Sequence, residues 1–188
     1  MDISYLKTGN AKQREAFAAL DRLGIFRTLA AFSPVLAGTV PIDIDVEDSD
    51  LDIICEMREP EALEQVLIPA YGALERFALS RERMHGDRVI VCNFRFGPWP
   101  VEIFAQNRQV TQQNAYKHMV VEDRILKRLG PVFRDNVRKL KSSGVKTEPA
   151  FARLLGLEGD PYQRLLDMHD WDEEKLGLFL VQQGFEPA

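Results

Sequence analysis

Cysteine and long apolar runs are scarce in this sequence of 188 residues. The two cysteines, Cys55 and Cys92, both lie in apolar segments, which predicts buried thiols in a reducing cytoplasm and argues against a cysteine metal site. No run approaches the roughly 20 apolar residues that a membrane-spanning helix needs. The N-terminus lacks the basic and apolar regions of a signal peptide. We therefore expect a cytoplasmic protein without a membrane partner.

Positive charge is concentrated in one stretch of the chain. The net charge is −5, yet residues 106–147 carry 10 Lys and Arg against 3 Asp and Glu, and both flanking segments are acidic. Such a stretch can supply cations for a polyphosphate, although solvated helix faces are the simpler interpretation for any single residue in it. Because the chain is acidic overall, the sequence disfavours nucleic acid as a partner.

An acidic motif gives the strongest indication of chemistry. Gly38 and Thr39 are followed, after nine residues, by Ser49, Asp50 and Asp52 at the start of an apolar run. Alternate side chains of a strand share a face, so Asp50 and Asp52 are expected side by side. Two adjacent carboxylates repel, and Mg²⁺ or Mn²⁺, which prefer oxygen ligands, would remove the repulsion. Gly38 permits close approach of a ligand to the backbone, and Thr39 adds a hydroxyl that suits phosphate.

The segment Pro41–Glu47 alternates apolar and acidic residues, a period of two that predicts an extended edge strand. A solubilising acidic edge explains its acids without any site. This explanation covers Asp43, Asp45, Glu47 and Asp48. It also stays open for Asp50 and Asp52, where the spacing from Gly-Thr favours the functional interpretation.

The Gly-Thr spacing and the Ser-Asp-x-Asp motif resemble the signature of polymerase-β-type nucleotidyltransferases, especially the minimal ones. Phrases at 140–152 and 159–162 resemble a bacterial family of unknown function related to that superfamily. The resemblance implies a third carboxylate on a later strand, for which Glu102 is the candidate. It also implies that Asp50, Asp52 and Glu102 hold Mg²⁺ or Mn²⁺ and carry out catalysis on a nucleoside triphosphate.

The nucleotide-binding residues that we expect come from two parts of the chain. Besides the Gly38, Thr39 and Ser49 of the motif, they include basic residues of the later helices. The candidates there are Lys139, Lys141, Lys146 and His118. For His118, a structural role inside a helix is the more frequent alternative.

The predicted fold is α/β, or α+β by strict naming. A helix and two strands precede a crossover helix and three further strands, and helices complete the chain. The expected result is a mixed central sheet of about five strands over residues 1–108, with a helical C-terminal subdomain over 109–188. A turn is predicted at His85-Gly86. A helix capped by Thr111 should end at Gly130-Pro131.

The leading functional hypothesis is transfer of a nucleoside monophosphate from a nucleoside triphosphate to a hydroxyl group. The acceptor, a small molecule or a protein, is not identified by the sequence. Two alternatives stay open: a catalytically inactive binding module with the same fold, and a metal-dependent phosphohydrolase. Leucines after residue 153 serve either the core or a homodimer contact.

Overall fold

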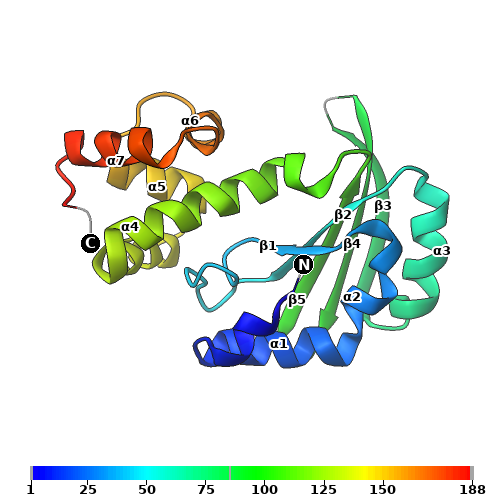
Figure 1. Ribbon diagram of the computed structural model, residues 1–188. Helices are drawn as coiled ribbons and strands as arrows, with labels where there is room; N and C mark the ends of the chain where they lie inside the picture. Colours follow the sequence, from blue (N-terminus) through cyan, green and yellow to red (C-terminus); the bar gives the residue numbers. More distant parts are fainter. Residues whose placement is uncertain (1, 85, 187–188) are drawn as a thin grey trace. The chain divides into compact units, whose positions relative to one another are not determined.

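The computed structural model describes residues 2–84 and 86–186 (Figure 1). The chain divides into two compact units. The first contains the chain up to Pro41 and resumes over Ser49–Gln113, and the second contains Ile42–Asp48 and the chain from Asn114 onward. The boundary after residue 108 stays a prediction. The sequence did not indicate that a short loop inside the acidic motif groups with the helical unit.

The first unit is built on a mixed sheet of five strands, in the order β1-β2-β5-β4-β3. The strands are β1 (Val35–Ala37), β2 (Leu51–Glu56), β3 (Glu75–Met84), β4 (Asp87–Phe96) and β5 (Trp99–Gln106). The β2 and β5 strands are parallel, and every other neighbouring pair is antiparallel. This arrangement confirms the predicted α/β class and the mixed sheet. His85, predicted in the turn between β3 and β4, lies outside the described residues.

Helices of the same unit precede β1 or connect β2 to β3. They are the 3-10 helix η1 (Ser4–Thr8), α1 (Ala11–Leu23), α2 (Ile25–Thr28), the 3-10 helix η2 (Ala30–Phe32) and α3 (Pro60–Tyr71). Asn10 and Gln13 form a reciprocal capping box that starts α1, and Gly24 ends it in a left-handed conformation with φ 63°. Local sequence therefore determines both ends of α1.

One face of the sheet forms the core of the first unit. Along β2, Leu51, Ile53 and Cys55 are fully buried, whereas Asp52 and Glu56 on the other face are partly exposed. The buried residues belong to one cluster with side chains from α1, α2 and α3. Apolar burial of this kind contributes about 25 cal/mol per Å². The helices thus cover one face, whereas Asp52 and Glu56 lie on the other, beside the buried Ile54.

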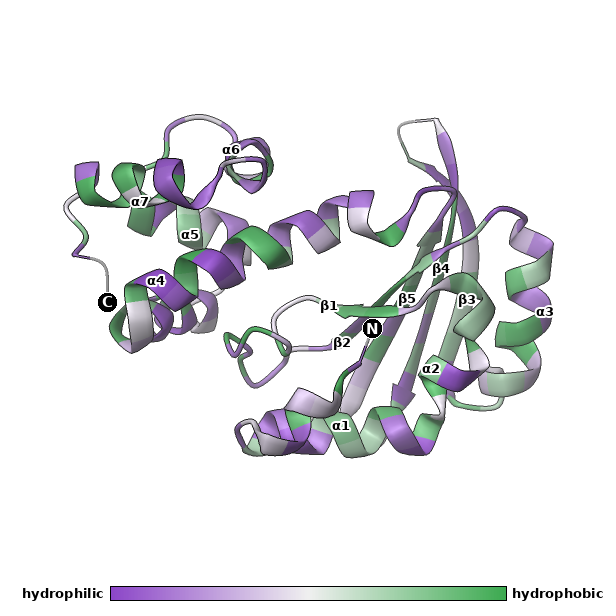
Figure 2. Cartoon of the chain, in the orientation of Figure 1, coloured by the Kyte–Doolittle hydropathy of each residue, from purple (hydrophilic) through white to green (hydrophobic). Residues whose placement is uncertain are grey.

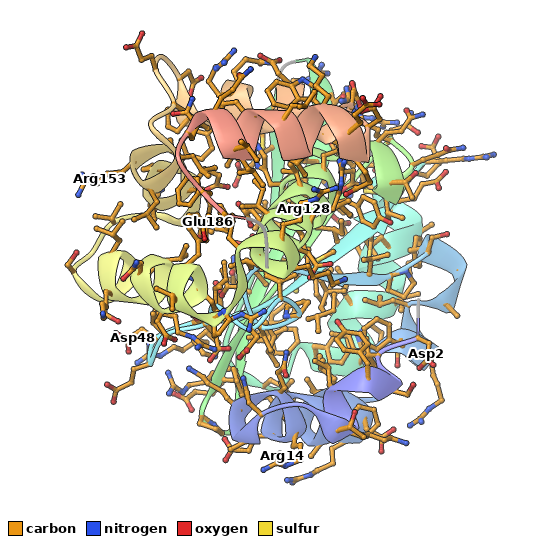
Figure 3. The ribbon with its side chains drawn as sticks, turned by 60° about the vertical axis from the view of Figure 1, so that its left-hand side comes forward. Asp2, Arg14, Asp48, Arg128, Arg153 and Glu186 are labelled. Atoms are coloured by element: carbon orange, nitrogen blue, oxygen red, sulfur yellow. The ribbon has the colours of Figure 1, made fainter. Side chains whose placement is uncertain are left out.

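The second unit is helical. It contains α4 (Asn114–Ser142), α5 (Thr147–Leu155), α6 (Pro161–His169) and α7 (Glu173–Gln182). Figure 2 shows both hydrophobic and hydrophilic residues along α4, as expected for a helix with one packed side. Arg128 of α4, labelled in Figure 3, forms an ion pair with Glu173 at the start of α7, with 2.8 Å between Nη2 and Oε2.

The helix predicted to run from Thr111 to Leu129 has its expected end but a later start. Gly130, with φ 71° and ψ −165°, interrupts α4 before Pro131. The N-terminal prediction was wrong, because Thr111 lies in a 3-10 turn, η3 (Val110–Gln112), and α4 begins at Asn114. The intervening Gln113 is buried and donates from Nε2 to the Cys55 carbonyl at 2.9 Å, which holds this turn on the first unit.

The edge strand predicted over Pro41–Glu47 is absent, since the structure has turns and irregular backbone there. The alternation does describe burial, because Ile42 and Ile44 are buried and Asp43 is partly exposed. However, Asp43 has φ 61°, which is incompatible with a pleated strand. Its carboxylate instead pairs with arginines of α4.

Across residues 2–84 and 86–186, none of the helices has the length and apolar character required to cross a bilayer.

Candidate functional site: the acidic face of the sheet

Two predicted site residues face each other across neighbouring strands. Asp52 of β2 and Glu102 of β5 are partners in the parallel register, and both are partly exposed on the face opposite the core. Asp50 precedes β2 by one residue and is exposed. Residues 50 positions apart in sequence are thus brought together by strand pairing, which local patterns cannot specify.

The Glu102 carboxyl group lies in an unfavourable electrostatic environment. Burial raises its pKa above the usual value, and the negative charges of Asp50 and Glu82 raise it further. These influences all oppose ionisation. A bound cation would favour the carboxylate again, so this environment suits a positively charged ligand.

Gly38 follows β1 and lies directly beside Asp52. Its φ is 75°, and a Cβ atom built on it would lie 2.1 Å from Asp52 Oδ2. The sequence interpretation assigned this glycine to close approach of a ligand. The structure supplies a reason within the chain: a side chain at position 38 would force the Asp52 carboxylate to move.

The turn after Gly38 is fastened at two points inside the first unit. The Thr39 hydroxyl donates to Ser49 Oγ at 3.3 Å and so closes the two ends of the motif on each other. Gln13 of α1, itself 7% exposed, donates from Nε2 to the Val40 carbonyl at 2.9 Å. Gly38, Thr39, Ser49, Asp52 and Glu102 therefore form one local arrangement.

Sequence reasoning missed two polar residues of this arrangement. Asn93 of β4 is the cross-strand partner of Glu102 and is exposed. Glu82 of β3 is close enough to act on the pKa of Glu102. Asn is depleted in strands, so its presence at a solvent-facing position between Cys92 and Phe94 was an available signal.

The carboxylates suit a metal ion by chemistry, but they are not arranged as a complete set of ligands. Their oxygens are the donors that Mg²⁺ and Mn²⁺ prefer. The negative charges of Asp50 and Glu82 add to burial in raising the pKa of Glu102. Within the described part of the chain, however, no group of three or more His, Cys, Asp and Glu side chains could hold an ion as it stands. The metal site stays a prediction.

His118 belongs to the second unit and joins three of its helices. It is 8% exposed; its Nε2 lies 3.0 Å from the Tyr162 carbonyl oxygen of α6, and its Nδ1 lies 3.3 Å from Glu148 Oε1 of α5. Burial alone raises the pKa of Glu148, but the hydrogen bond with His118 and the nearby positive charges bring it below the usual value. These contacts give His118 a structural role, whereas a role toward nucleotide stays a prediction.

The predicted phosphate-binding lysines also lie in the second unit. Lys139 and Lys146 are exposed, and Lys141 is partly exposed. Lys139 and Lys141 are in the last turn of α4, and Lys146 precedes the first residue of α5. The structure thus groups them with one another and with His118, in a different unit from the acids.

Solved structures with a similar fold define the class to which this fold belongs. Cid1, in a structure concerned with its RNA terminal uridylyl transferase activity, is 16% identical with a TM-score of 0.54, covering 83% of this chain and 48% of Cid1. The Cid1 poly(U) polymerase with MgGTP bound gives 15% and 0.53, with coverages of 81% and 47%. The GLD-2/RNP-8 complex gives 13% and 0.50, with coverages of 82% and 62%.

The chain therefore shares the fold of these nucleotidyltransferase structures, and it spans about half the length of the Cid1 structures. At these identities the similarity establishes the fold alone. The chain belongs to the family described as "Domain of unknown function (DUF4269)", which matches residues 18–168. No curated protein matches the sequence.

Proposed function

We propose that the protein is a metal-dependent nucleotidyltransferase that transfers a nucleoside monophosphate from a nucleoside triphosphate to a hydroxyl acceptor. The observation that carries this proposal is the pairing of Asp52 with Glu102 on adjacent parallel strands, within the field of Asp50. This grouping lies beside the Gly38 turn, on the sheet of a nucleotidyltransferase fold. The DUF4269 family would then be a nucleotidyltransferase family.

The three carboxylates share the binding of metal in this proposal, and Glu102 has a second role. Asp50, Asp52 and Glu102 would hold Mg²⁺ or Mn²⁺, and the ions would neutralise the triphosphate and the charge that develops during transfer. Glu102 is the candidate base for the acceptor hydroxyl, because its carboxyl group is partly exposed opposite Asp52 on the neighbouring strand. Positioning of the reactants would supply much of the remaining rate enhancement.

Hydroxyl and backbone groups near Gly38 are suited to hold phosphate. The Thr39 and Ser49 side chains are partly exposed and within hydrogen-bonding distance of each other. Lys139, Lys141 and Lys146 are proposed as further phosphate contacts. His118 is the weakest member of this set, because both of its ring nitrogens already face oxygen atoms of the second unit.

The acceptor is the least constrained part of the proposal. Cid1 is named as an RNA terminal uridylyl transferase and as a poly(U) polymerase, so the sequence-based expectation against nucleic acid has no support from the structural relatives. A small molecule or a protein hydroxyl group remains our proposal. An RNA oligonucleotide belongs in the same assay as these acceptors.

Thermal unfolding with ATP, GTP, CTP and UTP, each with and without Mg²⁺, tests the proposed site. A ligand at 100 times its dissociation constant stabilises the folded state by about 2.7 kcal/mol. We expect a magnesium-dependent rise in Tm for at least one nucleotide, and its loss in Asp52→Asn. Asp48→Asn is the matched control, because this exposed acid lies in the same motif but outside β2. Equal shifts in both variants would overturn the assignment.

A non-catalytic module is the second candidate, because no set of three ligands is preassembled within the described residues. Such a module would bind nucleotide without releasing pyrophosphate. Product analysis with labelled nucleotide also separates the third alternative. A phosphohydrolase releases free phosphate or nucleoside monophosphate in the absence of any acceptor, whereas a transferase makes a labelled adduct.

A further inference from the structure

The loop Ile42–Asp48, hereafter the 42–48 loop, lies between the two halves of the acidic motif. The chain leaves the first unit after Pro41 and returns to it at Ser49. Gly38 and Thr39 lie just before the loop, and Asp50 lies just after it. The covalent chain therefore links the loop to both halves of the candidate site.

The loop is anchored within the second unit. Ile42 and Ile44 are 7% and 0% exposed, and Asp43 between them pairs with Arg138 and with Arg134, whose Nε lies 3.6 Å from Asp43 Oδ2. The Asp43 side chain is 30% exposed, so these ion pairs are partly shielded from water. Asp43 also has φ 61°, a conformation uncommon outside glycine that persists only where surrounding contacts enforce it.

The ends of the loop are fastened within the first unit. The hydrogen bond between Thr39 and Ser49 joins them, and Gln13 holds the Val40 carbonyl. Asp48, the exposed last residue of the loop, is labelled in Figure 3. The segment is therefore held at both ends and at Asp43, the second of its seven residues.

We propose that Asp43, Arg134 and Arg138 form a positioning clamp, which holds the 42–48 loop on α4 and thereby orders Thr39, Ser49 and Asp50 for nucleotide binding. This inference rests on the proposed function. The clamp residues act through the loop and do not themselves contact the substrate. The coupling makes the state of α4 a determinant of the order of the acidic motif.

The chain offers a matched control for the clamp. Asp135 also pairs with Arg138, with 3.3 Å between Oδ1 and Nη1, but it lies on α4 itself and its side chain is 61% exposed. Removing Asp135 takes one negative partner from the same arginine without releasing the loop. For the clamp itself Asp43→Asn is suitable, because Asn tolerates positive φ.

Hydrogen exchange of the backbone amides of Thr39 and of 49–52 tests the clamp without any assay of activity. Asp43→Asn and Arg138→Gln should each accelerate exchange at these amides by about three- to tenfold, because local opening becomes easier. Asp135→Asn should leave the rates unchanged, and Arg138→Lys should restore most of the protection. Unchanged exchange in Asp43→Asn, or equal acceleration throughout the chain, would overturn the proposal.

The dissociation constant of the magnesium–nucleotide complex provides the second measurement. Asp43→Asn should raise it by about tenfold at a temperature where both proteins are folded, and Asp135→Asn should not raise it. If the wild type binds no nucleotide, the proposed function fails while the exchange result still decides the clamp. If exchange accelerates at the motif but nucleotide affinity is unaltered, the clamp is not a positioning device and the proposal is overturned.

Discussion

The acidic side chains around Glu102 have different neighbours from Asp43 and Glu148. On the sheet of the first unit, burial raises the pKa of Glu102, and the negative charges of Asp50 and Glu82 raise it further. In the second unit, Asp43 pairs with two arginines and Glu148 with His118. Pairing with an opposite charge stabilises an acidic side chain in a folded protein. Like charges placed close together oppose folding and are frequent in functional sites. The surroundings of Glu102 therefore make it a candidate for a functional site, whereas the contacts of Glu148 indicate a structural role.

The largest effect should come from crowding the Asp52 carboxylate. Gly38→Ala would place a Cβ atom 2.1 Å from Asp52 Oδ2 at φ 75°, so both a clash and backbone strain arise. We expect a loss of about 2–4 kcal/mol in the free energy of unfolding, measured in urea. Gly97→Ala is the control for strain alone, because its φ is 60° and nothing lies within 4 Å of the added atom. Similar losses in both variants would contradict the close contact.

A smaller loss of stability should follow removal of the Glu148 carboxylate, which pairs with His118. The pKa of Glu148 is lowered, so its contribution to stability is present above the unfolded value of about 4.5 and is lost as the pH falls through the folded value. Glu148→Gln should therefore lose about 1.5–3 kcal/mol at pH 7, the range for hydrogen bonds to charged groups. The difference from wild type should shrink below pH 4.5. Urea unfolding at several pH values measures it, and a constant difference would exclude this linkage.

Removal of the Glu102 charge is expected to raise stability instead of lowering it. The raised pKa of Glu102 means that the folded protein binds this proton more tightly than the unfolded chain does. Stability therefore falls as the pH rises above the unfolded value of about 4.5. Glu102→Gln should remove this dependence and raise the free energy of unfolding at pH 7 by about 0.5–2 kcal/mol, the range of typical stabilising substitutions. Thermal melts across pH test it. A variant that is less stable at pH 7 would assign Glu102 a structural role.

Much of the fold could be predicted because the relevant signals are local. The Asn10–Gln13 capping box, the glycine at the end of α1 and the Gly130-Pro131 interruption of α4 are each encoded within a few residues. Strand β2 was recognisable from an apolar run with one acid on its open face. These features need no knowledge of distant contacts.

The remaining features depend on residues far apart in the chain. The alternation of apolar and acidic residues over 41–47 predicted a strand. However, the arginines that pair with Asp43 come from α4, more than 90 residues later. Likewise, Gln113 delays the start of α4 through a hydrogen bond to Cys55. The register that opposes Asp52 to Glu102, and the exposure of Asn93 beside it, became visible only in the assembled sheet.

Binding of Mn²⁺, followed by nuclear magnetic resonance, tests the central claim most directly. Mn²⁺ broadens signals of nearby nuclei, so substoichiometric addition in the presence of a nucleoside triphosphate should first affect amides around Asp52 and Glu102. Asp52→Asn should abolish this selectivity, and Asp48→Asn should preserve it. Broadening that begins at other acids, such as Glu61 and Glu64 beside Arg81, or that is the same in Asp52→Asn, would contradict a metal–nucleotide site on this face of the sheet.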